Sequence, residues 1–339
     1  MTDAPIRWGI LGTGTIARVF TEDLLRMPGH SVVAVGSRAP HTAEAFAARY
    51  GIGRAHGSYE ALADDHAVDV VYVATPHNGH HPAALRCLEG GRAVLVEKPF
   101  TTSAADADHL IAVAAERGLF AMEAMWTRFN PVITRLRTLV ADGAIGEVTS
   151  VYADFSFSSA FDPVHRLWSP GLAGGALLDV GVYPLSFASM LLGAPDTVQA
   201  TAAPAPTGVD ANTGILLGYV SGAVALLHCG LMADSPQTAT VTGTRGRIEV
   251  AAPFFRPEAM TVHRPGAEPE TFTTEIDGHG YTYQAAEVAR CLRAGALESP
   301  LMPLRETRDI LGTLDTIAAL LGGPAQAARP DGLRASGSR

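Results

Sequence analysis

The chain has 339 residues, of which 47% are hydrophobic and 17% are charged, and its formal net charge is −9. This composition is typical of a globular protein long enough for two domains, and the acidic balance argues against nucleic acid as the main partner, because a phosphate backbone is bound through clustered basic side chains. No apolar stretch looks long enough to span a bilayer, so a membrane partner is not expected either.

The N-terminus and the cysteines give an expectation about the compartment. The chain passes from Met1 into a strand within a few residues, without the basic and apolar regions of a signal peptide, which predicts a cytoplasmic location. The cysteines are odd in number and show no close pairing, so neither a disulfide framework nor a zinc site is predicted. Small buried side chains are the expected role of Cys87, Cys229 and Cys291.

The first element is an apolar strand at residues 6–11, followed by a glycine-containing turn and then by apolar residues at helical spacing. Glycines let the backbone turn tightly and approach a pyrophosphate, and the N-terminus of the following helix supplies amide donors. A second strand, at residues 31–36, ends at the distance where a Rossmann unit places the residue that reads the ribose. The sequence therefore predicts a dinucleotide site at Gly12, Thr13, Gly14, Thr15 and Ile16.

Two residues at the end of the second strand indicate which dinucleotide binds. Ser37 and Arg38 stand where NAD-binding proteins carry aspartate or glutamate. A carboxylate there binds the ribose hydroxyls of NAD and repels a 2′-phosphate, whereas a hydroxyl and a guanidinium suit the phosphate of NADP. NADP is therefore the preferred cofactor and NAD remains an option, with an ordinary exposed arginine as the alternative interpretation.

A third strand, at residues 68–74, is apolar with little alternation, as expected of a parallel strand covered on both faces. Ligands bind at the carboxyl ends of such strands, so we expect the following residues to line the nicotinamide site: Thr75, Pro76, His77 and His80. Together with His81 these histidines suggest a metal as the alternative. The loop lacks a convincing ligand set, so no metal is predicted.

A fourth strand, at residues 92–96, delivers Glu97 and Lys98 to the same edge of the sheet. Lys98 is the only lysine in the chain, which otherwise uses arginine throughout. An ammonium is a compact charge that can lose its proton in a protein, whereas a guanidinium stays charged and is shaped for planar contacts. This favours a catalytic role for Lys98, with chance in an arginine-rich composition as the alternative.

The second half contains a series of strand signals without long interrupting helices, which predicts a mostly antiparallel sheet. The signals lie at residues 148–157, 212–219, 223–229, 238–242 and 247–250. The expected fold is an α/β Rossmann domain plus an α+β domain with a large, mostly antiparallel open sheet. We assign residues 1–124 to the cofactor-binding domain, 125–321 to a substrate-binding and dimerisation domain, and 322–339 to a flexible tail.

A predicted helix at residues 177–192 carries Asp179 and Tyr183 four residues apart. This spacing puts a carboxylate and a phenol on one face, where they can share a pocket. The alternative is a buried tyrosine bonded to its helix neighbour. Aromatic and basic residues near these groups in the sequence suit a pocket with aromatic walls and polar anchors, although several are expected to be core residues. They are Trp126, Arg128, Phe129, Phe155, Phe161, Arg166 and Trp168, of which Trp126 and Arg128 are also candidates for holding the cofactor.

Motifs along the chain resemble one family of oxidoreductases. Residues 12–17 (GTGTIA), 74–76 (ATP) and 97–99 (EKP) are similar, in this order, to the glucose-fructose oxidoreductase and inositol dehydrogenase superfamily (Gfo/Idh/MocA). Residues 122–129 (MEAMWTRF) and 174–184 (GGALLDVGVYP) resemble the branch with dimeric dihydrodiol dehydrogenase and NADP-dependent xylose dehydrogenases. The likeness also includes Gly280-Tyr281 and Met302-Pro303-Leu304, and it covers roughly residues 5 to 320.

The resemblance implies that Lys98 is catalytic and faces the acid and the tyrosine of the second domain. Many relatives have histidine where Tyr183 stands, so Tyr183 fits the tyrosine-using branch. The family also implies homodimers that pack sheet on sheet. The implied substrates are an aldose such as xylose, oxidised to its lactone, or a trans-dihydrodiol, oxidised to a catechol.

The expected chemistry is hydride transfer between nicotinamide and a carbinol carbon, coupled to movement of the hydroxyl proton. We expect Tyr183 to be the general acid/base, Lys98 to lower the pKa of Tyr183, and Asp179 to orient them. The alternatives are a ketosugar reductase of a biosynthetic pathway, a cofactor-recycling glycosidase of the same superfamily, and a noncatalytic NADP-binding sensor.

Overall fold

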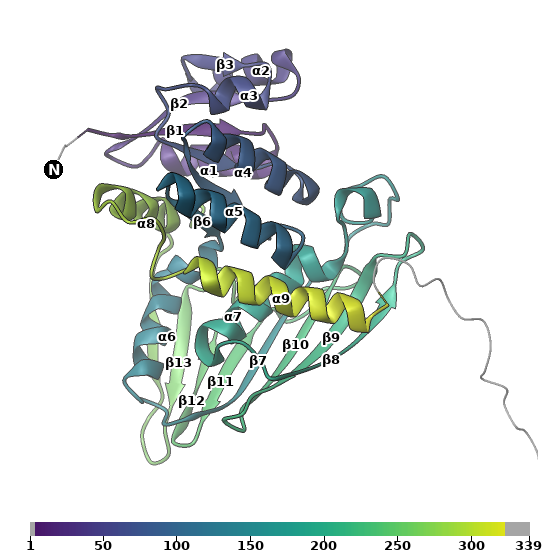
Figure 1. Ribbon diagram of the computed structural model, residues 1–339. Coiled ribbons are helices and arrows are strands. Elements are labelled where there is room, and N and C mark those ends of the chain that lie inside the picture. The colour runs from purple at the N-terminus through teal and green to yellow at the C-terminus, as the bar shows by residue number, and fades with distance from the viewer. Residues whose placement is uncertain (1–3, 323–339) are drawn as a thin grey trace, which may run out of the picture.

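Six parallel strands form the upper sheet of the computed structural model, which describes residues 4–322 (Figure 1). The strand order is β3-β2-β1-β4-β5-β6. The strands are β1 (Ile6–Leu11), β2 (His30–Gly36), β3 (Arg54–His56), β4 (Val70–Val73), β5 (Ala93–Glu97) and β6 (Ala121–Ala124). Every residue of β4, β5 and β6 is buried, which explains why these segments show no polar alternation.

Helices connect and cover these strands, as a Rossmann domain requires. They are α1 (Thr15–Leu24), α2 (Pro40–Tyr50), α3 (Tyr59–Ala63), α4 (His80–Glu89) and α5 (Ala104–Arg117). A short 3₁₀ turn, η1 (His77–Gly79), precedes α4. Because all six strands run in one direction, the segments that follow β1, β4 and β5 meet at one edge of the sheet, and this edge carries the candidate site.

The lower sheet in Figure 1 has eight strands in the order β14-β13-β12-β11-β7-β10-β9-β8. Only β7 and β10 pair in parallel among them, so the sheet is mostly antiparallel, as predicted. The strands are β7 (Val148–Ser156), β8 (Thr197–Pro204), β9 (Asp210–Gly218), β10 (Val224–Gly230), β11 (Ala239–Gly243), β12 (Gly246–Val250), β13 (Ala259–His263) and β14 (Glu270–Thr273).

Helices lie on one face of this sheet and leave the other face open (Figure 1). They are α6 (Pro131–Ala141), α7 (Val182–Leu192) and α9 (Leu304–Leu320). Buried and exposed residues alternate along β9, where Ile215 and Leu217 are buried against the helices and Leu216 is 40% exposed on the open face. This alternation is the pattern of an antiparallel sheet with one covered face.

The last two helices return to the first domain. Helix α8 (Thr282–Arg293) packs on α1, and α9 packs between α5 and β8. The predicted domain boundary falls at the end of β6, and the C-terminal helices then tie the two domains together. The predicted flexible tail lies, apart from Gly322, outside the described residues.

The expectation that no apolar stretch is long enough to span a bilayer was wrong. The segment Pro170–Leu192 has the length and the hydropathy, 1.5 on average, of a helix that crosses a membrane. Within this protein 72% of its most apolar window is buried, because α7 fills the space between the open sheet and α9. The apolar side chains of this segment therefore belong mostly to the protein core.

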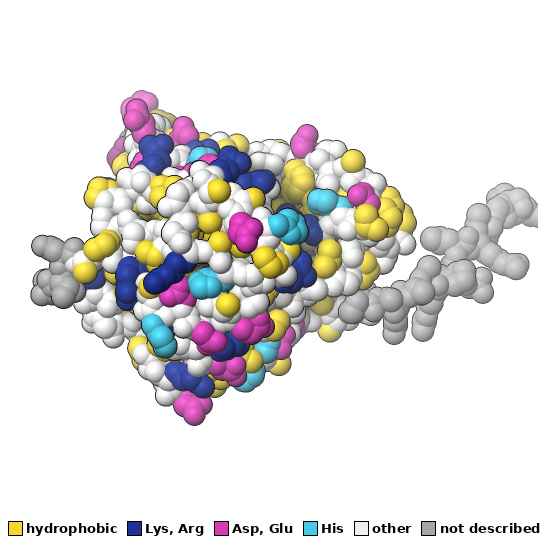
Figure 2. Space-filling view, turned by 90° about the horizontal axis from the view of Figure 1, so that it is seen from above, with side chains coloured by type: hydrophobic (Ala, Val, Ile, Leu, Met, Phe, Trp, Pro, Cys, Tyr) yellow, Lys and Arg dark blue, Asp and Glu magenta, His cyan; other side chains and the backbone are white. Residues whose placement is uncertain are grey.

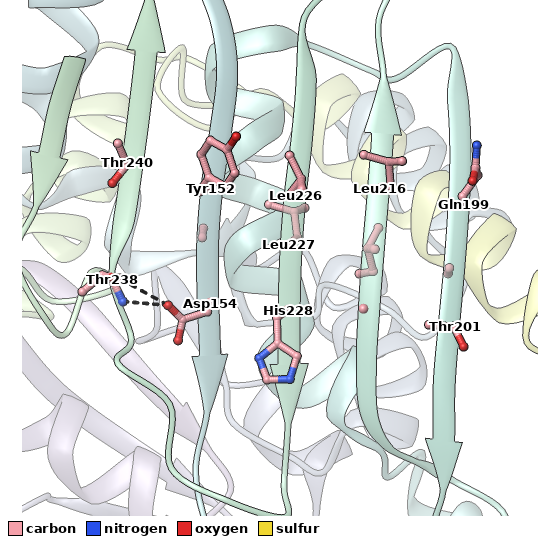
Figure 3. Close-up of a pocket in the computed structure, with 14 residues that line it drawn as sticks. Tyr152, Asp154, Gln199, Thr201, Leu216, Leu226, Leu227, His228, Thr238 and Thr240 are labelled. Atoms are coloured by element: carbon pink, nitrogen blue, oxygen red, sulfur yellow. Dashed lines mark hydrogen bonds between the residues drawn. The ribbon is translucent and has the colours of Figure 1, made fainter.

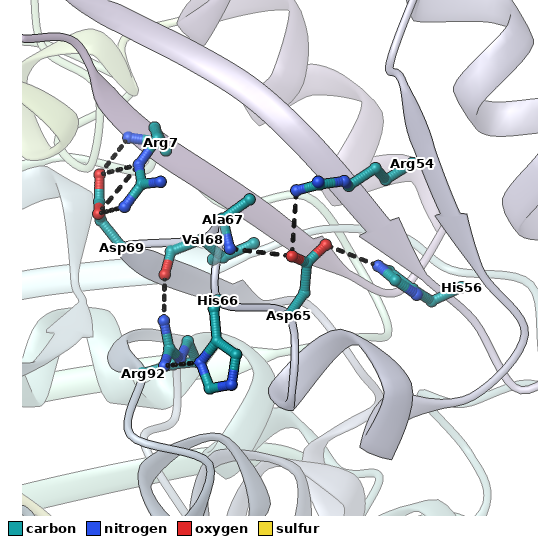
Figure 4. Close-up of polar contacts among 9 residues, drawn as sticks. All are labelled: Arg7, Arg54, His56, Asp65, His66, Ala67, Val68, Asp69 and Arg92. Carbon is teal, nitrogen blue, oxygen red and sulfur yellow. Dashed lines mark hydrogen bonds and ion pairs between the residues drawn. The ribbon is translucent and has the colours of Figure 1, made fainter.

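Polar contacts join the amino-terminal edge of the first sheet (Figure 4). Asp65 accepts hydrogen bonds from the amide of Ala67 (2.9 Å) and from Arg54 (3.1 Å), and it lies 2.9 Å from His56 Nε2. These bonds attach the segment before β4 to the edge strand β3. On the outer surface of this domain, seen from above in Figure 2, basic and acidic side chains are interspersed.

Candidate active site

A glycine turn lies between the end of β1 and the start of α1. Gly12 has a φ of +109°, and a Cβ there would lie 2.6 Å from the carbonyl oxygen of Ala74, so both conformation and space require glycine. Gly14 precedes α1 without a side-chain cap, and a Cβ on it would meet nothing within 4 Å. The first amides of α1 are therefore available to a phosphate, and the turn fits the pyrophosphate of a dinucleotide.

Thr13 lies in this turn, and Thr15 and Ile16 are the first residues of α1. Thr15 begins α1, and its hydroxyl accepts a hydrogen bond from Arg18 Nη2 at 3.0 Å. Arg18 thus brings a cation to the phosphate-facing turn. Sequence reasoning missed it, because an arginine in a helix is usually a solvated surface residue.

At the end of β2 the structure places Ser37 and Arg38 beside the start of α2. Ser37 Oγ lies 2.6 Å from Thr42 Oγ1, and Arg38 is exposed. Hydroxyls and an exposed guanidinium in this short segment are groups that suit a phosphate on the adenosine ribose. Thr42 is an addition to the predicted set.

Lys98, Asp179 and Tyr183 meet at the carboxyl edge of the first sheet, although they come from different domains. Lys98 follows β5, Asp179 lies in the π-helical turn η4 (Leu177–Gly181), and Tyr183 lies in the first turn of α7. The Lys98 ammonium donates to the Asp179 carbonyl at 2.6 Å and lies 3.5 Å from its carboxylate. It is also 5.0 Å from the centre of the Tyr183 ring.

Two cations and a histidine ring surround the buried Asp179 carboxylate. Arg166 Nη1 lies 2.7 Å from Oδ1, and His77 Nε2 and Lys98 Nζ each lie 3.5 Å from it. Burial opposes ionisation, but Lys98, Arg166 and His77 together hold the pKa of Asp179 below its usual value. Asp179 is therefore an anion that fixes the ammonium and the half-exposed guanidinium.

His77 is a neutral member of this group. Burial and the neighbouring Lys98 lower the pKa of His77 to about 3. Its Nδ1 donates to the carbonyl of Ala173 at 3.1 Å, and Asn78 donates to the carbonyl of Gly171 at 2.8 Å. These contacts join the loop after β4 to the segment before η4 and keep His77 beside Asp179, while its contact with the nicotinamide stays a prediction.

Tyr183 differs from the sequence expectation in its electrostatics. Burial and the nearby Glu97 raise the pKa of Tyr183, and a hydrogen bond from Trp126 Nε1 (3.0 Å) opposes this rise only in part. Lys98 was expected to lower this pKa. The ammonium lies 5.0 Å from the centre of the ring, and the pKa is raised and not lowered, because burial and Glu97 dominate. Tyr183 is consequently a protonated phenol at neutral pH.

Glu97 and His80 hold the walls of the site together. Glu97 is buried and accepts hydrogen bonds from the Tyr72 hydroxyl and from the Lys98 amide (3.2 Å). The ring nitrogens of His80 lie 2.7 Å from the Pro99 carbonyl and 2.9 Å from the Thr75 carbonyl. His80 lies between the loops after β4 and β5, and because burial lowers its pKa to about 4, the single N–H of the neutral ring donates to one of these two carbonyls.

The structure does not bring Arg128 to the cofactor. Its guanidinium is buried, with Nε bonded to the Ser186 hydroxyl (2.9 Å) and Nη2 bonded to Glu306 (2.7 Å). It therefore joins α7 to α9, which does not fit its predicted role in holding the cofactor. Phe129, on the same short turn η2 (Trp126–Phe129), is buried in the main core together with Trp126 and Tyr183, and its contact with a substrate stays a prediction.

Trp168 and Phe161, two other predicted pocket residues, lie in or beside a second, smaller hydrophobic cluster. Trp168 is 3% exposed, and its indole donates to the Ala160 carbonyl at 2.9 Å. Phe161 packs edge-on against it with ring centres 5.5 Å apart, and is 47% exposed. Trp168 is thus a structural residue, while Phe161 keeps a surface that a ligand or a partner can reach.

Aromatic rings form the wall around Tyr183. Phe155 packs edge-on against Tyr183 at 5.2 Å, and Phe255 stacks on Phe155 at 4.1 Å. Tyr281 stacks on Trp126 at 4.5 Å. Sequence reasoning gave no role to Phe255 or Tyr281. The signal that could have pointed to Tyr281 was the Gly280-Tyr281 pair in the family resemblance. In the structure a Cβ at position 280 would lie 3.1 Å from the Trp126 ring.

Residues 4–322 also have features away from this site. They contain no group of three histidine, cysteine or carboxylate side chains arranged to hold a metal ion. A hollow of about 630 Å³ lies on the open face of the second sheet (Figure 3). It is not the catalytic pocket, because neither Lys98 nor Tyr183 lines it.

A dinucleotide turn in a parallel sheet, joined to a second domain that brings an acid and a phenol to a lysine, defines a two-domain nicotinamide-dependent oxidoreductase. Residues 6–125 match the family model described as oxidoreductase family, NAD-binding Rossmann fold, and residues 133–249 match the GFO/IDH/MocA C-terminal domain. The chain belongs to the GFO/IDH/MocA oxidoreductase family.

Curated relatives cover nearly the whole chain. Trans-1,2-dihydrobenzene-1,2-diol dehydrogenase of Mus musculus is 38% identical, over 94% of this chain and 97% of its own length. D-xylose 1-dehydrogenase (NADP(+)) of Hypocrea jecorina is 37% identical, over 91% of this chain and 90% of its own.

Solved structures are similar throughout both domains. A 3-ketoreductase from Actinomadura kijaniata in complex with NADP has a TM-score of 0.77 and 28% identity, covering 94% of this chain and 98% of its own. Aldose-aldose oxidoreductase from Caulobacter crescentus has a TM-score of 0.84 and 25% identity, covering 93% and 97%.

Proposed function

We propose that the chain transfers a hydride between NADP and the carbinol carbon of a sugar, such as an aldose, or of a trans-dihydrodiol. The observation that carries the proposal is the meeting of Lys98, Asp179 and Tyr183 beside the dinucleotide turn. When bound, the nicotinamide supplies the hydride chemistry, for which the protein has no group of its own. The residues of this chain have to bind and orient the substrate and to exchange its hydroxyl proton.

The cofactor-binding residues are the turn from Gly12 to Ile16 for the pyrophosphate, and Ser37 with Arg38 for the 2′-phosphate. Arg38 is exposed at the start of α2, and no carboxylate follows β2 to repel a phosphate. The NADP named in the xylose dehydrogenase and ketoreductase relatives supports the same preference. NAD is the weaker alternative.

Tyr183 is the general acid/base in this proposal. Its pKa is raised, so the phenol holds its proton at neutral pH and donates it when a carbonyl substrate is reduced. In the oxidation direction Tyr183 must first lose that proton. The Trp126 indole N–H, 3.0 Å from the hydroxyl oxygen, stabilises the anion that forms.

Lys98 is the electrostatic partner and Asp179 its support. The ammonium is held by two oxygens of Asp179 and keeps one side towards the Tyr183 ring. From there it stabilises negative charge on the substrate oxygen as the proton moves. Solved structures of the 3-ketoreductase relative include a lysine-to-alanine variant and a tyrosine-to-phenylalanine variant. These are the two residue types to which we give the proton and charge chemistry here.

The proposed substrate pocket has aromatic walls and a cationic rim. Trp126, Phe155 and Tyr183 supply rings suited to a sugar ring or a cyclic diol. Arg166, whose side chain is 49% exposed, supplies hydrogen-bond donors at the rim. The names of the relatives include both substrate types, a dihydrodiol and an aldose.

The test is an absorbance assay at 340 nm with purified protein, NADP or NAD, and a panel of aldoses, inositols and dihydrodiols. Reduction of NADP by an aldose or a dihydrodiol supports the proposal. Oxidation of NADPH by a ketosugar alone supports the ketosugar reductase, which the 3-ketoreductase relative favours. Tight NADPH binding without turnover of any substrate would refute the enzyme and favour a sensor.

We also propose that the chain is a homodimer that packs through the open face of the second sheet. One row across this face carries Tyr152, Leu226 and Leu216, which are cross-strand neighbours and 40–47% exposed (Figure 3). An exposed apolar row on a broad sheet suits a second copy of the same face.

A further inference from the structure

Asp179 offers two oxygen atoms to Lys98, and one of them is unusual. The ammonium donates to the backbone carbonyl of Asp179 at 2.6 Å, while the carboxylate lies farther away, at 3.5 Å. A carbonyl inside a helix ordinarily accepts a hydrogen bond from a backbone N–H of the next turn. The availability of this carbonyl to a side chain therefore requires a local cause.

The cause lies in the helical register and in Pro184. Asp179 belongs to the π-helical turn η4, in which the carbonyl of residue i faces the N–H of residue i+5. Five residues after Asp179 stands Pro184, which has no N–H. Pro184 lies in the first turn of α7, where a helix tolerates proline. The position that would donate in this register therefore carries no N–H, and the Lys98 ammonium donates to the Asp179 carbonyl at 2.6 Å.

The other end of the turn is anchored by Asp210. Its Oδ2 accepts hydrogen bonds from the amide of Leu177 (2.7 Å) and from the hydroxyl of Thr213 (2.8 Å). Gly175 has a φ of +115°, and a Cβ on it would overlap the Asp210 carboxylate. Asp210 thus holds the first amide of the turn from a neighbouring strand, β9.

A close contact also fixes the middle of the segment. Gly181 packs against β10, where a Cβ would lie 2.8 Å from Cys229 Sγ. The turn is therefore fixed at its first amide and against the sheet, and Pro184 follows it in the first turn of α7. π-Helical turns of this kind are found frequently at functional sites.

We propose that Pro184 and Asp210 are positioning residues that keep η4 in its π-helical register and so reserve the Asp179 carbonyl for Lys98. Neither side chain needs to touch the substrate. The inference extends the proposed function, since it explains how the ammonium is aimed, but the bond itself exists without cofactor or substrate.

The test uses the fact that Lys98 is the only lysine. Protein labelled with ¹⁵N at lysine Nζ gives one side-chain ammonium signal, and the exchange of its protons with water is measured without NADP. Pro184→Ala restores an N–H that competes for the Asp179 carbonyl. We expect ammonium exchange to become about tenfold faster, the scale of one lost hydrogen bond, and the scalar coupling between Nζ and the Asp179 carbonyl carbon to disappear.

Pro131→Ala is the matched control, because Pro131 also lies in the first turn of a helix, α6. Its Lys98 signal should be unchanged. A folded Pro184→Ala protein with wild-type exchange and coupling would overturn the inference. If Pro184→Ala does not fold, Asp210→Asn takes its place, and unchanged exchange in that variant counts equally against the proposal.

The readout separates this inference from the proposed reaction. Faster exchange in a protein that oxidises and reduces no tested substrate would refute the proposed function and support the positioning role. Normal exchange in a variant with impaired turnover would locate the defect elsewhere and overturn the positioning role.

Discussion

Lys98 occupies a space shaped for an ammonium. Nζ is shared between the carbonyl and the carboxylate of Asp179, with the Tyr183 ring 5.0 Å away. A planar guanidinium keeps the charge but is larger and directs its donors differently. Lys98→Arg should therefore keep NADPH binding, measured by fluorescence titration, and lose most of kcat. A variant that retains a near-normal rate would remove Lys98 from the mechanism.

The hydrogen bond from Trp126 to Tyr183 gives a prediction about pH. Trp126 lowers the pKa of Tyr183, which burial and Glu97 raise. Removing the indole N–H in Trp126→Phe should raise this pKa further, so the pH profile of kcat for oxidation should move to higher pH. Tyr183→Phe is the comparison, because it should lose about a hundredfold or more in rate and the associated pH dependence. An unmoved profile in Trp126→Phe would contradict the role of the indole.

Arg38 gives a prediction about cofactor choice. Arg38 is exposed in the segment between β2 and α2, directly after Ser37, whose hydroxyl lies 2.6 Å from that of Thr42. Arg38→Ala should raise KM for NADP at least about tenfold, the scale of one charge-assisted contact, and leave KM for NAD unchanged. Equal effects on both cofactors would indicate a general loss of the fold and not a lost phosphate contact.

At the scale of elements, regular patterns in the sequence were sufficient for the buried strands. The apolar runs of β1, β4 and β5 and the alternation in β9 and β10 correspond to strands in the structure. Strand β8 gave no clear signal, because its residues are small or polar and it ends in Pro204. Such a composition is tolerated at the edge of a sheet, where one side of the strand needs no partner.

Asp65 carries the prediction for this scale. Burial opposes its ionisation, but the Ala67 amide, His56 and Arg54 together lower the pKa of Asp65. Its contribution to stability is therefore present above the ordinary value of 3.8 and is lost as pH falls through the lowered folded pKa. The free energy of unfolding of Asp65→Asn should be about 1–2 kcal/mol lower than that of the wild type at pH 7. This difference should shrink at acid pH. Urea titrations at several pH values test this. A constant difference would contradict it.

At the scale of the whole molecule, the open sheet face predicts the oligomeric state. Leu226 lies between Tyr152 and Leu216 in the exposed row, so a charge there would be buried between two copies (Figure 3). Leu226→Glu should convert the dimer into a monomer in light scattering. Leu25→Glu is the matched control, because Leu25 is 52% exposed at the end of α1, far from this sheet in the fold. A wild-type monomer would refute the dimer.

The sequence alone determined the local features of this protein: the glycine turn before α1, the solitary Lys98 after a buried strand, and the four-residue spacing of Asp179 and Tyr183. These depend on residues close together in the chain, so their periodicity and chemistry are visible in it. Only the tertiary structure decided that Trp126 binds the Tyr183 hydroxyl, that Tyr281 covers Trp126 and that Arg128 points inward to Glu306. The physical reason is that these contacts join residues from 57 to 178 positions apart, and their distances are set by how the two domains pack.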